Sequence, residues 1–265
     1  MRYSVSQLRT YTECPRKWYM SYVLEVGSQG TASMKLGSLM HIMLADYHAG
    51  RDTNFDVLGR EYSLDLLTEA IRLMPFYQEA DKNHHIQIVQ DGYTPEVWLE
   101  IPVGEDSIFG RCDFIAFDSE GKLIIGEHKT SSQAWNEWRF MLDFQTGVYA
   151  AMGGGIYPND GVSVLFNVIK TTKKKEPVWE EVLQREVVKA PSDKRYDTLS
   201  EVREVVRRIK ETKLMYEAYK TEGFSCGFCC YNFLCVLGND PQVVKESLFF
   251  VPKVKREEVE INDRI

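Results

Sequence analysis

Four residues in two neighbouring segments have the chemistry needed to hydrolyse a phosphodiester bond. Asp113 follows Gly110 in a G-x-x-D pattern, and Glu127, His128 and Lys129 follow a short apolar run in an E-x-K pattern. Successive side chains of a β-strand point to opposite faces, so Glu127 and Lys129 share one face and His128 points away. Asp113, Glu127 and the backbone carbonyl of His128 offer oxygen ligands suited to Mg²⁺ or Mn²⁺. Lys129 can orient the attacking water or stabilise transition-state charge.

An isolated E-x-K pair is far more often a surface ion pair than a site, at odds of about ten to one. Three features of this chain shift those odds. Glu127 follows the apolar run 123–125 and Gly126, which indicates the end of a buried strand, and His41 lies on an otherwise apolar segment. Gln145 and Tyr149 are four residues apart and would share one helix face. Each of these residues alone is more often an ordinary core or surface residue, so only the combination favours a site.

Three of the six cysteines lie close together, with Cys226, Cys229 and Cys235 in a C-x2-C-x5-C pattern. A C-x-x-C pair places two thiolates on one metal without straining the backbone. A fourth soft ligand is needed, and Cys14 is a candidate from the other end of the chain. Zinc and an iron–sulfur cluster both accept four thiolates, so spacing leaves the metal open. Cys230 is an alternative to Cys229 that departs from this spacing.

The periodicity of apolar residues predicts the elements that must position these groups. A turn at 118–121 predicts a hairpin that carries both halves of the acidic site. The order of elements predicts an α/β domain with a mixed central sheet flanked by helices. Helices are expected at 4–23 (with a break at Cys14-Pro15), 33–48, 59–74, 136–152 and 196–219, and strands at 97–101, 108–117, 123–129, 161–170 and 180–189.

The four motifs together resemble the RecB-like branch of the PD-(D/E)XK nuclease superfamily, which includes the CRISPR-adaptation nucleases and their phage-encoded relatives. That family carries a helix histidine, a G-x-x-D strand, an E-x-K strand and a Q-x-x-x-Y helix, in the order seen here. The resemblance implies a restriction-endonuclease-like core and a catalytic Lys129. It also implies that His41, Asp113 and Glu127 bind the metal, with the carbonyl of His128. Gln145 and Tyr149 would then position the DNA or the site.

The cysteines also resemble those of the iron–sulfur members of this branch, which have one cysteine before the catalytic motifs and three after them. The resemblance implies a [4Fe–4S] cluster on Cys14, Cys226, Cys229 and Cys235. We expect a single nuclease domain over 1–265, with a catalytic core at 31–219. Segments 1–30 and 220–240 would form a cysteine clasp that closes a very long loop and couples cluster binding to folding.

Charge gives little support for a nucleic-acid partner. The net charge is −7 and the pI about 5.4, which argues mildly against a bulk electrostatic DNA binder. Arg16 and Lys17 lie among aromatic residues, an arrangement that can track single-stranded DNA or simply pack the clasp. Lys173 and Lys174 form another basic cluster, for which a solvated face is an equal explanation.

No apolar run is long enough for a transmembrane helix, and no signal-peptide core is found, so we expect a cytoplasmic protein, in the host cytoplasm if phage-encoded. We expect a Mg²⁺- or Mn²⁺-dependent exonuclease that acts on single-stranded or unwound DNA. The chain has no G-x-x-x-x-G-K-[ST] motif, so unwinding would come from a helicase or a recombination or adaptation partner. The alternatives are a non-catalytic nucleic-acid-binding scaffold in such a complex, and a zinc-clasped protein of unrelated activity.

Overall fold

The computed structural model describes residues 1–27, 30–83, 94–118, 120–156, 162–172, 174, 176–189, 192–238, 240–247 and 250–253. Contacts divide the chain into two compact units. Unit 1 contains Met1–Arg9 and Gly30–Arg207, and unit 2 contains Thr10–Gln29 and Arg208–Ile265. The three motif segments around Asp113, Glu127 and Gln145 therefore belong to unit 1, while Cys14 and the C-terminal cysteines belong to unit 2.

Unit 1 is built on a mixed six-stranded sheet of the described residues, ordered β1-β3-β4-β5-β6 with β2 also paired to β3. β1 with β3 and β4 with β5 are parallel, and the other pairs are antiparallel. The predicted mixed sheet is thus confirmed, although the short strand β1 was not predicted. The strands are β1 (Arg2–Ser4), β2 (Thr94–Val103), β3 (Asp106–Phe117), β4 (Leu123–Ser131), β5 (Ser163–Lys170) and β6 (Leu183–Lys189).

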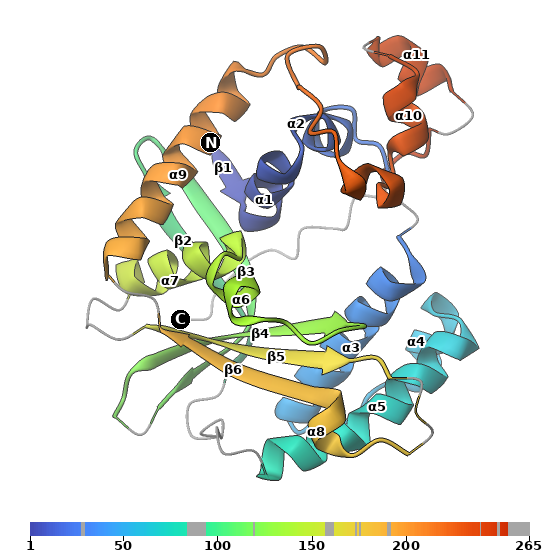
Figure 1. Ribbon diagram of the computed structural model, residues 1–265, viewed down its shortest axis with the longest axis vertical. Helices are drawn as coiled ribbons and strands as arrows, with labels where there is room; N and C mark the ends of the chain where they lie inside the picture. Colours follow the sequence, from blue (N-terminus) through green and yellow to red (C-terminus); the bar gives the residue numbers. More distant parts are fainter. Residues whose placement is uncertain are drawn as a thin grey trace. The chain divides into compact units, whose positions relative to one another are not determined.

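Helices cover both faces of the sheet in unit 1. Figure 1 shows α3 and α5 along one face of β4–β6, with α6 and α7 on the other. The helices of unit 1 are α3 (Ala32–His48), α4 (Phe55–Glu61), α5 (Leu64–Asn83), α6 (Glu137–Met141), α7 (Phe144–Ile156) and α8 (Trp179–Val182). The helices α1 (Val5–Glu13) and α9 (Ser192–Glu211) span the unit boundary.

Two helices that the periodicity predicted as continuous are each broken in the structure. The predicted helix 59–74 is replaced by α4 and α5, and the predicted helix 136–152 by α6 and α7. At the second break Asp143 accepts a hydrogen bond from the backbone N–H of Thr146, at 3.1 Å, and so caps the start of α7. The predicted helix 196–219 was also too long, because α9 ends at Glu211. At the start of α7, local capping, which apolar periodicity does not report, therefore sets the boundary.

The pairing of β3 creates an opening in the sheet at the predicted site. β2 occupies one edge of β3 along almost its whole length, so β1 and β4 share the other edge. β1 pairs with β3 only as far as Phe109, and β4 pairs with it only from Phe114 onward. Residues 110–113 therefore have no strand partner on that edge among the described residues. Asp113 is the last residue of this segment, next to the point where β4 begins to pair with β3.

Unit 2 has its own small core, built largely from aromatic residues around Cys14. Tyr11, Trp18 and Tyr19 are each about 95% buried, and Trp18 packs edge-on against both tyrosines. Their burial favours the explanation that these rings pack the clasp, and the DNA contact of this segment stays a prediction. The helices of unit 2 are α2 (Pro15–Trp18), a π-helix (Tyr19–Val23), a 3₁₀ helix (Phe224–Phe228), α10 (Asn232–Val236) and α11 (Pro241–Glu246).

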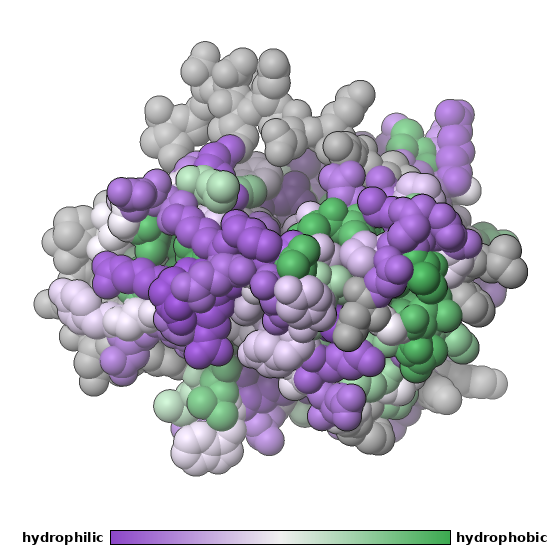
Figure 2. All heavy atoms as spheres, turned by 90° about the horizontal axis from the view of Figure 1, so that it is seen from above, coloured by the Kyte–Doolittle hydropathy of each residue, from purple (hydrophilic) through white to green (hydrophobic). Residues whose placement is uncertain are grey.

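The surface of the molecule carries both hydrophilic and hydrophobic residues. Figure 2 shows a face that is largely hydrophilic, with hydrophobic residues gathered in separate patches. Exposed apolar side chains are common on folded proteins and carry no conclusion singly. Within the described parts of the chain, every helix is too short or too polar to cross a membrane.

Candidate active site

The opening between β3 and β4 brings Asp113 into contact with two other elements. Its Oδ1 lies 2.7 Å from Nδ1 of His41 on α3, and its Oδ2 accepts a hydrogen bond from the backbone N–H of His128 on β4. The missing strand pairing at 110–113 is therefore partly replaced by a side-chain bond. This arrangement joins three of the predicted site residues, which come from three separate elements of the chain.

Glu127 lies beside this pair and is only 5% exposed in its side chain. One carboxylate oxygen, Oε1, accepts a hydrogen bond from Nζ of Lys129, as the shared strand face predicted. The other, Oε2, is buried and has no hydrogen-bond partner in the described part of the chain. Leaving a buried carboxylate oxygen unsatisfied is costly, so such an atom points to a group that binds there. The donor set fits a hard divalent cation.

The two carboxyl groups have opposite pKa shifts. Burial raises the pKa of Glu127 to about 7, and the charge of Asp113 adds to this while Lys129 opposes it. Burial also disfavours ionised Asp113, but the hydrogen bond and the charge of His41 hold the pKa of that carboxyl below its usual value. The pKa of His41 is raised, because its hydrogen bond and attraction to Asp113 outweigh burial. His41 thus supplies positive charge beside Asp113, whereas Lys129 offsets the cost of burying ionised Glu127 only in part.

A chain of hydrogen bonds links this centre to α7. Nζ of Lys129 donates to Oε1 of Gln145 at 2.8 Å, and Nε2 of Gln145 donates to the hydroxyl of Tyr149 at 3.1 Å. Tyr149 in turn donates to the backbone carbonyl of Arg111 at 2.8 Å. Gln145 and Tyr149 therefore share the face that their spacing predicted. They fix the ammonium of Lys129 relative to β3.

The side chain of His128 points away from the acids, as predicted, and enters a buried polar network that the sequence did not reveal. Nδ2 of Asn167 on β5 lies 3.2 Å from Nδ1 of His128. Oδ1 of Asn167 accepts a hydrogen bond from Nε of Arg185 on β6, at 2.6 Å. Arg185 also donates to Asp81 on α5 at 2.8 Å, and its side chain is fully buried. Burial lowers the pKa of His128 to about 3, so the ring is neutral and can accept a hydrogen bond from the amide of Asn167.

This network was missed because its members come from four elements and form no short motif. Tyr77 on α5 extends it, since its hydroxyl lies 2.9 Å from Nε2 of His48 and 3.5 Å from the amide nitrogen of Asn167. The rings of His48 and His128 stack with centroids 6.1 Å apart. The network anchors β4 from the side opposite to Glu127.

Glu96 is a further acidic residue near the centre that sequence reasoning did not single out. The pairs on either side of it in the β2–β3 register place it opposite Asp113. Its backbone has a φ of 55°, a left-handed conformation that costs a non-glycine residue energy. Its carboxylate pairs with Arg111 at 2.7 Å. Burial raises the pKa of Glu96, and of its neighbours Arg111 opposes the rise while Asp113 adds to it.

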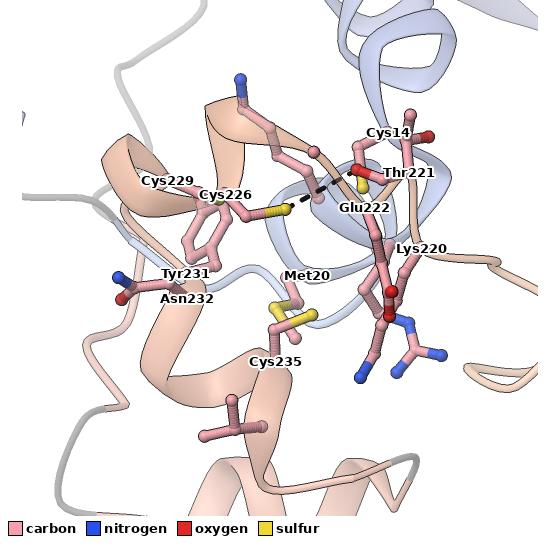
Figure 3. A pocket seen from close by; sticks show the side chains of 14 residues that line it. Cys14, Met20, Lys220, Thr221, Glu222, Cys226, Cys229, Tyr231, Asn232 and Cys235 are labelled. Atoms are coloured by element: carbon pink, nitrogen blue, oxygen red, sulfur yellow. Dashed lines mark hydrogen bonds between the residues drawn. The ribbon is translucent and has the colours of Figure 1, made fainter.

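The four predicted cluster ligands line one pocket in unit 2. Its volume is about 340 Å³, and its walls include Cys14, Cys226, Cys229 and Cys235. Figure 3 shows the sulfur atoms of Cys14, Cys226 and Cys235 turned toward the same space. Cys230, the alternative ligand, is not part of this wall. The donor set and the room in the pocket fit a metal group held by four thiolates.

Neither candidate centre is assembled as a finished metal site. Across the residues that the structure describes, no three His, Cys, Asp or Glu side chains lie close enough together to hold a metal ion. Both metal assignments therefore remain predictions.

The residues predicted to contact DNA are placed in different ways. Arg16 is 3% exposed, donates to the carbonyls of Ala218 and Gly238 at 2.8 and 3.2 Å, and holds unit 2 together. This placement argues against the DNA contact predicted for Arg16. Lys17 is half-buried and pairs with Glu13, exposed Lys174 pairs with Glu181, and Lys173 lies outside the described residues.

A family model matches most of the chain. Residues 2–236 match the model described as the PD-(D/E)XK nuclease superfamily. A local likeness links 119 residues, at 30% identity, to gelsolin of Drosophila melanogaster and covers 40% of this chain and 15% of that protein. Because the chain spans only that small share of gelsolin, this second likeness carries no argument about function.

Among solved structures, a protein of Eubacterium rectale named "Putative exonuclease" aligns with a TM-score of 0.52 at 11% identity, over 86% of each chain. The structure of SSO0001 aligns with a TM-score of 0.44 at 15% identity, over 88% of this chain and 85% of that one. A phage related exonuclease from Haemophilus somnus 129PT aligns with a TM-score of 0.34 at 12% identity, over 80% and 96%. The first likeness supports the fold alone, and the other two carry no argument.

Proposed function

This chain belongs to the PD-(D/E)XK nuclease superfamily, and we propose that it is a divalent-cation-dependent DNA exonuclease that acts on single-stranded or unwound DNA. The observation that carries this proposal is the buried, unpartnered Oε2 of Glu127, beside Asp113 and Lys129. A structural ion pair would not need a second carboxylate oxygen kept out of water and without a donor. A cation site does need one.

The proposed metal-binding residues are His41, Asp113, Glu127 and the backbone carbonyl of His128. Mg²⁺ or Mn²⁺ held by these groups supplies Lewis-acid stabilisation of the charge that develops on the phosphate oxygens. Burial makes ionised Glu127 unfavourable when no cation is bound. A bound cation would compensate the carboxylate, so this burial favours cation binding.

Lys129 is the proposed catalytic residue. Its ammonium is held between Glu127 and Gln145, so it is oriented before substrate arrives. From there it can orient the attacking water and stabilise negative charge in the transition state. Gln145 and Tyr149 are positioning residues in this proposal, because they act on the substrate through Lys129 and the backbone of β3.

A cleavage assay tests the proposal. Purified protein with Mn²⁺ or Mg²⁺ should release nucleotides from end-labelled single-stranded DNA, and EDTA should stop the release. Lys129→Ala should lower the rate by roughly 100-fold or more. Lys122→Ala is the matched control, because Lys122 is an exposed lysine of the same hairpin, paired with Glu120. Full activity of Lys129→Ala would refute the role of this site.

Substrates with blocked ends test the exonuclease part separately. A circular single strand and an open strand of the same length should differ, with degradation only of the open strand. Equal degradation of both would show endonuclease activity and would contradict this part of the proposal.

A non-catalytic nucleic-acid-binding scaffold is the second candidate, and the net charge of −7 gives it some support. A helicase or a recombination or CRISPR-adaptation protein would be the partner in either case. Absence of cleavage by wild-type protein with either cation, together with binding to such a partner, would favour the scaffold.

We further propose that Cys14, Cys226, Cys229 and Cys235 hold a structural [4Fe–4S] cluster, with zinc as the alternative metal. The shared pocket of about 340 Å³ supports the choice of ligands. Elemental analysis should find iron and acid-labile sulfide in anaerobically purified protein. Cys14→Ser should lose the metal, whereas the control Cys230→Ser should retain it. Zinc without iron would overturn the iron assignment, and retention of metal by Cys14→Ser would overturn the ligand set.

A further inference from the structure

Two aromatic rings lie between two guanidinium groups on one face of the β2–β3 hairpin. Cζ of Arg2 lies 4.6 Å from the ring centre of Phe109, whose centroid is 5.8 Å from that of Trp98. Cζ of Arg111 lies 5.8 Å from the ring centre of Trp98. We call Arg2, Phe109, Trp98 and Arg111 the stacked row. Its planar groups follow one another across three strands.

The register explains why these side chains share a face. Trp98 pairs with Arg111 directly across the two strands, and residues two apart on one strand point the same way. Their neighbours Leu99 and Cys112 point to the opposite face and are buried. Trp98 is 41% exposed, and the side chain of Arg111 is 49% exposed. The stacked row is therefore open to solvent while the other face forms core.

The stacked row leads to the candidate active site. Arg111 lies two residues before Asp113 on β3, and its ion-pair partner Glu96 stands opposite Asp113 in the register. The backbone carbonyl of Arg111 is also held by Tyr149. A nucleic acid strand with one phosphate at Asp113 would therefore have its neighbouring nucleotides within reach of Trp98.

The row offers exposed aromatic and guanidinium surface rather than net charge. Arg2 forms two hydrogen bonds with Glu100, at 3.1 and 2.8 Å, and Arg111 pairs with Glu96 at 2.7 Å. Each cation is thus balanced by a carboxylate. Nucleobases stack on aromatic and guanidinium planes without needing this charge, but they can do so only when they are unpaired.

We propose that the stacked row binds bases of a single-stranded DNA segment adjacent to the cleaved phosphate, with Trp98 as the main stacking surface. This inference rests on the proposed nuclease function. The stacked row would then give the protein a preference for single-stranded over duplex substrate, because the bases of a duplex have no free faces that can stack on Trp98.

Binding measured in EDTA tests the proposal without cleavage. In fluorescence anisotropy with a labelled single-stranded oligonucleotide, Trp98→Ala should raise Kd about tenfold, which corresponds to about 1.4 kcal/mol. Trp98→Phe should recover most of the affinity, because it keeps a ring. Phe55→Ala is the control: Phe55 is an aromatic residue of α4 with similar exposure, 45%, and its loss should leave Kd unchanged.

An abasic oligonucleotide of equal length separates stacking from a structural role. If Trp98 binds bases, wild type and Trp98→Ala should bind the abasic strand equally. Loss of abasic binding in Trp98→Ala, or wild-type affinity of that variant for the normal strand, would overturn the proposal. The rise in Kd caused by Trp98→Ala should also be similar at low and high salt, since stacking does not release counterions.

Failure of this inference can be distinguished from failure of the proposed function. If wild type cleaves DNA with Mn²⁺ but Trp98→Ala binds normally, only the stacked row is refuted. If Trp98→Ala loses binding but wild type cleaves nothing with either cation, the row stands as a nucleic-acid site and the nuclease proposal falls.

Discussion

Replacement of Glu127 by glutamine should change how the stability of the metal-free protein depends on pH. Glu127 is 4% exposed, and burial raises its pKa from 4.5 to about 7. A carboxyl group with a raised folded-state pKa contributes stability that is fully present below the unfolded pKa and is lost as pH rises through the folded one. The window for Glu127 is therefore about pH 4.5 to 7.

The magnitude follows from these two pKa values. Ionisation of Glu127 in the metal-free fold should cost about 3 kcal/mol at pH 8 relative to pH 4.5. The glutamine side chain of the variant keeps an oxygen that can accept from Lys129, but it cannot ionise. The free energy of unfolding of Glu127→Gln, measured relative to wild type, should thus improve by about 3 kcal/mol across this window.

Urea unfolding in EDTA at several pH values is the assay. Glu186 on β6 provides the control, because its carboxyl group is exposed. The difference in unfolding free energy between Glu186→Gln and wild type should change little with pH. Mn²⁺ at pH 8 should stabilise wild type more than Glu127→Gln, since the cation compensates the carboxylate. A difference between wild type and Glu127→Gln that is the same at every pH would refute the account of Glu127.

Three other substitutions test the surroundings of the site. Arg185→Met should destabilise the fold by about 3–5 kcal/mol in urea unfolding, because it leaves buried Asp81 without its cation; a cost below about 1 kcal/mol would contradict this. Gly126→Ala should cost at least about 1–3 kcal/mol in the same assay, because the new Cβ would lie 1.9 Å from Cζ of Phe114, and wild-type stability would show that this close approach is not required. Tyr149→Phe should cost about 1 kcal/mol of stability and lower kcat with little change in KM, and an unchanged kcat would remove it from the positioning chain.

The mixed sheet could be predicted from apolar periodicity, and the superfamily from the resemblance of four dispersed motifs to a known family. The E-x-K spacing placed Glu127 and Lys129 on one face, and the spacing of Gln145 and Tyr149 placed both on one side of α7. The match over residues 2–236 confirms the superfamily, whereas the RecB-like iron–sulfur branch stays a prediction. Short-range periodicity was sufficient to place these pairs of side chains on shared faces.

Features that depend on long-range pairing could not be predicted in the same way. The network around Asn167 and Arg185 joins strands and helices with no common motif, and the role of Arg16 within unit 2 depends on carbonyls more than 200 residues away. The stacked row needs the exact alignment of Trp98 with Arg111, which is set by the β2–β3 register. Register is specified by the whole hairpin and its packing, so local patterns do not reveal it.

The central claim is that Asp113, Glu127 and Lys129 form a cation-dependent hydrolytic site, and one measurement tests it most directly. Initial rates of nucleotide release from single-stranded DNA should be compared for wild type, Asp113→Asn and the hairpin control Lys122→Ala, with Mn²⁺ and with EDTA. We expect Mn²⁺-dependent release by wild type and Lys122→Ala, and a loss of roughly 100-fold or more in Asp113→Asn. Wild-type rates in Asp113→Asn, or release that persists undiminished in EDTA, would contradict the claim.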